Sequence, residues 1–302
     1  MNGLFRSLVE DPAPALVIEV STDGIVAVRR GSKGSPALRR AERNFEPGTL
    51  DPAPTRPNIA NAGQFSAALG AALDDLGPRN GSETALILPD ASSRVTVLDF
   101  DEFPSSPEER LKLMRSRLTK AVPFDIAAAR IAYQASKTRR GYSVLVALTP
   151  VEVVRQYEGA LAQFGLWSGF VSVSSAAAMN LLSDGDMNLL VKLAPSGLMT
   201  LAAVENGVVR LVRSVDLGSL EARPANDLLR DMLADIFPTQ VFVADSLGQS
   251  VDQLVLCGFG EYLPAALELF PQELGCAAKP LESSEGPVGR REAGLWGYLS
   301  LS

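Results

Sequence analysis

The chain has 302 residues, of which 46% are apolar and 21% charged, so it is long and apolar enough to form a sizeable core. A net charge of −7 gives it no general electrostatic attraction to phosphate backbones or anionic lipid. It contains no histidine, which excludes Ser-His-Asp catalysis, Cys-His catalysis and His-based metal sites.

The two cysteines, Cys257 and Cys276, are too few for a disulfide framework or a Cys-rich zinc site, and we expect two reduced thiols. No run reaches the roughly 18–20 apolar residues that a membrane-spanning helix needs. The first residues also lack the apolar core and cleavage site of a signal peptide. We expect residues 1–14 to form an N-terminal tail, in which Leu4, Phe5 and Leu8 fall at helical spacing.

The chain opens with elements that are typical of an α/β protein. Residues 15–30 form two apolar runs joined by Ser-Thr-Asp-Gly, which predicts a β-hairpin. The Pro- and Gly-rich residues 31–62 predict a loose strand followed by an irregular connection. Apolar residues at helical spacing predict a helix over 64–76, and a short apolar run predicts a buried strand over 83–88.

The next stretch carries the clearest local signals. A strand over residues 94–103 ends at Pro104, and a helix follows. Ser106 at the N-cap and Glu109 three residues later form a capping box. Pro123 ends this helix, because the residue before a proline is disfavoured in the α conformation. An extended run then reaches residue 134.

The rest of the chain continues to alternate between strands and helices. An Asn-Gly pair at 206–207 predicts a second hairpin turn, and Pro238 predicts a break or kink in a long helix. Strands are expected over 142–148, 167–173, 187–193, 198–205, 208–215 and 254–257, helices over 150–164, 174–182, 224–247 and 261–270, and a strand or helix over 292–301.

The order of elements over residues 85–134, with their prolines and the Pro123-Phe124 stop, resembles the type IV pilus assembly protein PilM family. The resemblance is specific there and diffuse over the rest of 16–298. It implies an α/β, actin-like (ribonuclease H-like) fold of two lobes, related to that of FtsA, with a small α+β subdomain inserted in the first lobe. The implied division is 15–91 with 165–185 for the first lobe, 92–164 for the insert, and 186–302 for a second lobe whose helical subdomain is missing or trimmed.

In this family, the nucleotide site is built on two hairpins that carry an Asp and a glycine, and on a glycine pair after a later strand. At the first hairpin, Glu19 stands in the place of the Asp and Ser21 in the place of the glycine. At the second, Lys192 replaces the acid and Ala194 the glycine. Both departures remove groups that would hold phosphate and magnesium.

Two of these positions leave alternatives open. Lys192 could hold a phosphate as a point charge or be a solvent-facing strand residue. Gly258 and Gly260 could face an adenosine or simply form a tight strand-to-helix turn. We therefore expect a pseudo-ATPase with no catalytic residue, no metal site and no cofactor, and with ATP and magnesium disfavoured. Its vestigial site would comprise Glu19, Ser21, Lys192, Gly258 and Gly260.

The resemblance implies a cytoplasmic scaffold of a type IV pilus platform, held at the inner membrane by a protein partner. That partner would be the N-terminal peptide of a PilN-like single-pass protein, bound in a groove between the first lobe and the insert. Residues expected at the groove are Arg115, Arg117, Lys120 and Phe124. A pilus motor ATPase, platform proteins and a homo-oligomer remain further candidates, and nucleic acid is not expected.

Three alternatives belong to the same fold. An active ATPase or small-molecule kinase would need intact phosphate hairpins, against which Glu19, Lys192 and Ala194 argue. The cytoplasmic domain of a type II secretion L-like protein would be followed by a membrane span. An FtsA-like division protein would need a C-terminal amphipathic helix. No such segment is expected from the residues at the end of this sequence.

Overall fold

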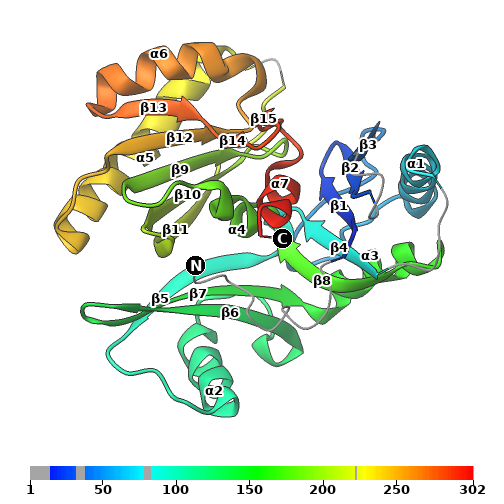
Figure 1. Ribbon diagram of the computed structural model, residues 1–302, viewed down its shortest axis with the longest axis horizontal. Coiled ribbons are helices and arrows are strands. Elements are labelled where there is room, and N and C mark those ends of the chain that lie inside the picture. The colour runs from blue at the N-terminus through cyan, green and yellow to red at the C-terminus, as the bar shows by residue number, and fades with distance from the viewer. Residues whose placement is uncertain (1–13, 32–37, 78–82, 222, 302) are drawn as a thin grey trace.

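The computed structural model describes residues 14–31, 38–77, 83–221 and 223–301, and these residues form two lobes and an insert (Figure 1). The expected N-terminal tail, with Leu4, Phe5 and Leu8, lies outside the described residues apart from residue 14. Among the described helices, none combines the length and the apolar character that crossing a membrane requires.

The first lobe is a five-stranded sheet with the order β3-β2-β1-β4-β8. The predicted hairpin pairs β1 with β2, while β4 runs parallel to both β1 and β8. Apolar residues alternate along β1, so that α1 and α3 cover one face of the sheet and α4 and α7 the other. The elements are β1 (Leu16–Ser21), β2 (Gly24–Arg29), β3 (Arg39–Asn44), α1 (Ala62–Asp75), β4 (Glu83–Leu88), α3 (Val151–Ala162), β8 (Trp167–Val173), α4 (Ser174–Ala178) and α7 (Ala293–Leu299).

The second lobe repeats this order as β11-β10-β9-β12-β13. Its central strand β9 is buried along its whole length, because α5 and α6 cover one face and residues of α4 contribute to the core on the other. The two sheets share the same strand order, which is the duplicated pattern that the resemblance implies. The elements are β9 (Met187–Leu193), β10 (Leu198–Glu205), β11 (Val208–Asp216), α5 (Ala225–Leu247), β12 (Gln253–Cys257), α6 (Leu263–Leu274) and β13 (Ala277–Pro280), with a small hairpin of β14 (Glu282–Ser283) and β15 (Gly286–Pro287).

The insert is a three-stranded sheet with the order β5-β7-β6, and α2 packs on one face of it. The predicted capping box is confirmed on one side, since the Ser106 side chain accepts a hydrogen bond from the Glu109 amide. The other face contacts β11 of the second lobe, where the Ser143 hydroxyl donates to the Val209 carbonyl at 2.8 Å. The elements are β5 (Arg94–Phe100), α2 (Pro107–Leu118), β6 (Ala129–Thr138) and β7 (Gly141–Pro150).

One expectation about the second lobe is wrong at its end. The resemblance assigns all of 186–302 to the second lobe, but α7 packs against α4 and β1 of the first lobe. The reason is apolar burial: Leu295 and Tyr298 complete a core that contains Val17 and Val26. Between β11 and α5, the described residues contain no helix.

Candidate functional site

A buried ion pair links the two lobes at the position of one departure from the family pattern. Lys192, near the end of β9 in the second lobe, places its Nζ 2.6 Å from Oδ2 of Asp90, in the turn after β4 of the first lobe. The two side chains are only 5% and 4% exposed. Lys192 is therefore not a solvent-facing strand residue, and its charge is already matched by a carboxylate of the protein itself.

Glu19 lies beside this pair and binds to other elements of the first lobe. Its Oε1 accepts a hydrogen bond from the Ser174 hydroxyl at the start of α4, and its Oε2 accepts one from the Leu295 amide in α7 at 2.6 Å. Asp90 is held in turn by the Ser175 amide at 2.7 Å. We call Glu19, Asp90, Ser174 and Lys192 the interlobe cluster, since it joins β1, β9, α4, α7 and the turn after β4.

Burial and charge have opposing effects in the interlobe cluster. Burial raises the pKa of Glu19 to about 7, and the positive charge of Lys192 and the hydrogen bonds only partly offset this rise. For Lys192, burial disfavours the charged form, but the negative charges around it, Asp90 foremost, outweigh burial and raise its pKa. Lys192 is therefore a permanent internal cation, whereas Glu19 changes its protonation near neutral pH.

Cys257 is the nearest thiol to the interlobe cluster. It pairs with Lys192 in the ladder between β12 and β9, and burial raises its pKa to about 12. Both Cys257 and Cys276 are free thiols. A buried, protonated thiol is a poor nucleophile, so Cys257 acts as a core residue.

The first hairpin uses its polar groups to hold its own turn. The Ser21 Oγ lies 2.9 Å from Oδ1 of Asp23 and 3.1 Å from the Gly24 carbonyl oxygen. Oδ2 of Asp23 accepts a hydrogen bond from the Arg291 guanidinium at 2.7 Å. Ser21 is buried, and its hydroxyl is engaged within the turn.

The two predicted glycines differ in what they do. Gly258 has a φ of +81°, and a Cβ on it would lie 2.0 Å from the Leu193 carbonyl oxygen. Glycine is thus required there for the end of β12 to pass close to the end of β9, which is a packing role. Gly260 has a φ of +52°, and no atom lies within 4 Å of where its Cβ would be.

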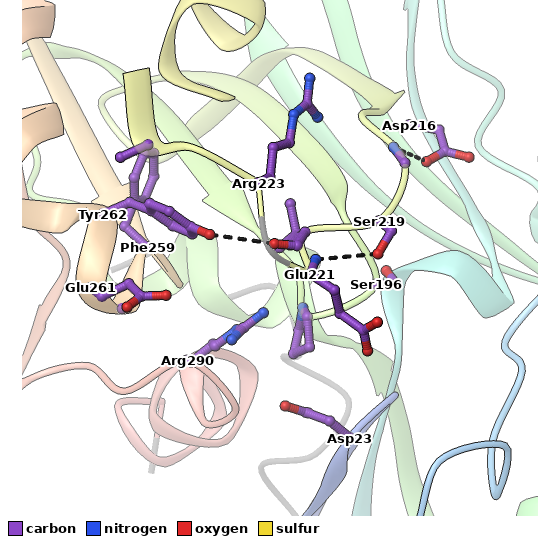
Figure 2. A pocket seen from close by; sticks show the side chains of 15 residues that line it. Asp23, Ser196, Asp216, Ser219, Glu221, Arg223, Phe259, Glu261, Tyr262 and Arg290 are labelled. Atoms are coloured by element: carbon purple, nitrogen blue, oxygen red, sulfur yellow. Dashed lines mark hydrogen bonds between the residues drawn. The ribbon is translucent and has the colours of Figure 1, made fainter. Parts of the chain in front are cut away.

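A cavity of about 1090 Å³ opens between the two lobes beside the hairpins (Figure 2). Of the five residues predicted for a vestigial nucleotide site, Gly260 lines it and the other four do not. Arg223 is occupied by Asp231 and by the Leu217 carbonyl oxygen, the latter at 2.7 Å. The charged lining is Asp23, Asp216, Glu221, Arg223, Glu261 and Arg290, so that carboxylates outnumber guanidinium groups.

A second, smaller cavity of about 310 Å³ lies between the insert and the first lobe. Two sheet edges face it, because β6 is the edge strand of the insert and β8 is the edge strand of the first sheet. All five residues from 130 to 134 of β6 line the cavity, and two of them, Ile131 and Tyr133, also pack against the core under α2. We call this space the β6–β8 groove.

Gln134 gives the β6–β8 groove an unsatisfied polar group. Its side-chain Oε1 is buried and has no hydrogen-bond partner among the described residues. The floor is apolar and includes Leu145 of β7 and Val173 of β8. A buried acceptor without a donor costs free energy, so a ligand that drew this side chain toward the groove and gave it an N–H would be favoured.

The four residues predicted for partner binding do not line the β6–β8 groove. Arg115, Arg117 and Lys120 are exposed at the end of α2 and just beyond it. Arg117 lines a different cavity, of about 700 Å³, which lies between the insert and the second lobe. Arg117 lies over the ring of Phe100 at 5.6 Å, and Phe124 packs partly buried into the core under α2. Sequence reasoning missed the groove residues of β6, although the alternation over residues 129–134 carried a usable signal.

No protein-family model and no curated protein matches the chain. Among solved structures, the PilM–PilN type IV pilus biogenesis complex is similar with a TM-score of 0.74 and 16% identity over 96% of this chain and 97% of that chain. A Bacteroides thetaiotaomicron protein with an actin-like ATPase fold and unknown function has a TM-score of 0.55 and 10% identity over 98% of each chain. The cytoplasmic domain of EpsL, an inner membrane component of the type II secretion system of Vibrio cholerae, has a TM-score of 0.51 and 11% identity over 95% of this chain and 94% of that chain. These likenesses establish the two-lobed actin-like α/β fold.

Proposed function

We propose that the protein is a scaffold of a pilus- or secretion-type assembly platform at the inner membrane, and that it binds a short cytoplasmic peptide of a PilN-like single-pass protein. The observation that carries the proposal is the β6–β8 groove, a preformed cavity between two sheet edges. The likeness to a structure of a PilM–PilN complex supports the choice of partner.

The groove suits an extended segment. An edge strand presents backbone N–H and C=O groups along its open side, and a peptide can pair with them as an added strand. The facing strand β8 lines the opposite side of the space, so a bound segment would lie between the two edges. Backbone pairing of this kind supplies affinity that depends little on the amino-acid sequence of the bound peptide.

Selectivity would come from the groove side chains. Leu145, Ala147 and Val173 form an apolar floor for one or two buried anchors. Gln134 supplies an acceptor for a peptide amide, either of the backbone or of an Asn side chain. Arg130 and Glu158 carry opposite charges along the lining. The expected ligand is thus a short, largely apolar peptide with at least one polar amide.

We also propose that this scaffold works without ATP. Lys192 is neutralised by Asp90 in the interior, so it is not available to a phosphate. The cavity between the lobes has a predominantly acidic lining. The protein would then be a pseudo-ATPase whose working surface is the β6–β8 groove.

The test is fluorescence anisotropy with a labelled peptide from the cytoplasmic N-terminus of a bitopic protein encoded beside this chain. Ala132 is exposed on the groove face of β6, so Ala132→Trp should fill the groove and weaken binding by at least about tenfold. Ala135→Trp is the matched control, because Ala135 is exposed on the same strand and does not line the groove. Equal affinity of both variants, or no binding at high micromolar concentration, would contradict the proposal.

A further inference from the structure

The long helix α5 has a second apolar face, most of which is exposed in the described structure. At one margin of this face, Phe242 lines a cavity of about 700 Å³ between α5 and the insert. Phe237, Val241 and Phe242 are 56%, 43% and 52% exposed, and they are three of the six large apolar residues that are exposed in the described chain. Ala234, one turn before Phe237, and Pro238, directly after it, are exposed as well. The opposite face of α5, with Met232, Ile236 and Val243 among others, is buried against the second sheet.

These exposed residues form a continuous stripe. At 3.6 residues per turn, positions 234, 237, 238 and 241 fall on one side of the helix, with Phe242 at its margin. A surface helix normally has a single apolar stripe, which faces its own core. An additional stripe in which two Phe side chains are more than half exposed marks an interaction surface.

The stripe has charged ends of opposite sign. Arg230 lies one turn before Ala234 on the same face, and Asp245 one turn after Val241. Both side chains belong to exposed residues, and neither takes part in an ion pair within the described part of the chain. Along α5, this face therefore begins with a cation at Arg230, continues with the apolar stripe and ends with an anion at Asp245.

We propose that this face binds the same face of a second copy of the chain, with the two α5 helices antiparallel about a two-fold axis. Arg230 lies seven residues before Phe237, and Asp245 lies seven residues after Pro238. An axis that passes between Phe237 and Pro238 thus brings Arg230 of each copy opposite Asp245 of the other. The same axis brings Ala234 opposite Val241, so a small side chain meets a larger one.

This self-complementarity is what favours a second copy over an unrelated partner. In a two-fold interface, every residue must be matched by a residue of its own patch, and the pattern of the α5 face meets that demand. A single pair of helices buries less than the roughly 1,200 Å² typical of stable complexes, so the dimer should be weak and concentration-dependent. The proposal does not depend on the peptide-binding function, since α5 does not line the β6–β8 groove.

Sedimentation equilibrium of the full chain tests the proposal. The apparent mass should rise from that of one 32.1 kDa chain toward that of two as the concentration increases from about 10 µM to about 1 mM. Phe237→Asp should abolish this rise. Arg230→Asp and Asp245→Arg should each abolish it as well, because the first places two acids opposite each other and the second two arginines.

The decisive step is to mix the two charge variants. In a mixed dimer, the new acid at position 230 of one chain meets the new arginine at position 245 of the other. The unchanged Asp245 of the first chain meets the unchanged Arg230 of the second, so both contacts are restored. The mixture should dimerise like the wild type, and circular dichroism should show the same helix content for all variants.

Four outcomes overturn the proposal. The first is a mixture of the two charge variants that stays monomeric, and the second is a wild type that is monomeric at every concentration. The third is a dimer that survives Phe237→Asp, since the stripe would then lie outside the interface. The fourth is a stripe that proves to bind a pilus-assembly partner in place of a second copy.

Discussion

Glu19 and Lys192 lie on corresponding strands of the two lobes, β1 and β9, and are both buried. Each is held by groups distant in sequence, since Lys192 binds Asp90 and Glu19 binds Ser174 and the Leu295 amide. The protein thus supplies its own cation at the junction between its lobes. In the interior such a cation is stable only while its partner carboxylates are present.

Replacing Lys192 tests this dependence. Lys192→Met should destabilise the protein by about 3–5 kcal/mol, because Asp90 would be left buried without its counter-charge. The measurement is urea unfolding followed by circular dichroism. Combining it with Asp90→Asn should recover part of the loss, since the uncompensated charge is then removed. A single variant that loses less than about 1 kcal/mol would contradict the assigned role of the pair.

The protonation of Glu19 should make stability depend on pH. Its pKa is raised from 4.5 to about 7 by burial, so the folded state binds the proton more tightly than the unfolded state. The resulting stabilisation is complete below pH 4.5 and is lost as the pH rises through 7. The loss is on the order of 3 kcal/mol.

Glu19→Gln should remove this contribution, which urea titrations at about pH 5 and about pH 8 would show. The difference in unfolding free energy between the two pH values should shrink in Glu19→Gln and remain in Glu285→Gln, a change at an exposed residue. If Glu19→Gln keeps the pH dependence of the wild type, another group is responsible.

At this scale, the sequence identified Glu19 and Lys192 as departures from the family pattern but not what binds them. Asp90 lies 102 residues from Lys192, and the Leu295 amide lies 276 residues from Glu19. Neither contact leaves a local signal, because it exists only once both lobes are folded. From the sequence, Lys192 was expected either to bind a phosphate or to face solvent. In the structure it does neither, because it forms a buried ion pair with Asp90.

Elements governed by local interactions could be predicted well. The turn between β10 and β11 has φ values of +49° at Asn206 and +72° at Gly207, as an Asn-Gly hairpin turn requires. The start of α2 follows from Ser106 and its cap. By contrast, β13 was not predicted, because Ala-Ala-Lys-Pro lacks the β-branched and aromatic residues typical of strands. The β6–β8 groove depends on which strands become sheet edges, and no single segment encodes that.

Two glycine substitutions distinguish a glycine that the backbone conformation requires from one that only lowers helix propensity. Gly258→Ala should destabilise the protein by at least about 2 kcal/mol, because its Cβ would collide with the Leu193 carbonyl oxygen and its φ is positive. Gly159→Ala, inside α3 with no atom near its Cβ position, should stabilise the protein by about 0.5–1 kcal/mol. Thermal unfolding of both variants measures the difference. Equal midpoints would show that β12 does not need its close approach to β9.

The two lobes of the molecule contain five-stranded sheets of identical strand order, with α4 and α7 between them (Figure 1). Residues of α4 belong to apolar cores on both sides, and the interlobe cluster adds the Lys192–Asp90 ion pair. In this arrangement, the angle between the lobes is supported by the chain's own contacts. We therefore expect the lobes to stay together without a bound nucleotide.

Thermal unfolding with and without Mg-ATP checks this expectation. A ligand present at about 100 times its dissociation constant would add about 2.7 kcal/mol to the unfolding free energy, which is several degrees in the midpoint for a chain of this size. We expect the midpoint to stay within about 1 °C at about 1 mM Mg-ATP. A calorimetric titration that gave micromolar affinity would contradict the expectation.

The position of α7 sets a condition on the order in which the chain can fold during its synthesis. Leu295 and Tyr298 close the core over Val17 and Val26, yet the ribosome makes them only after the entire second lobe. Domains that fold as they emerge normally complete their N-terminal part first. Here the first sheet must wait, with one apolar face covered only by α4, until residues 293–299 leave the exit tunnel, so this face is where a nascent chain would need protection by a chaperone.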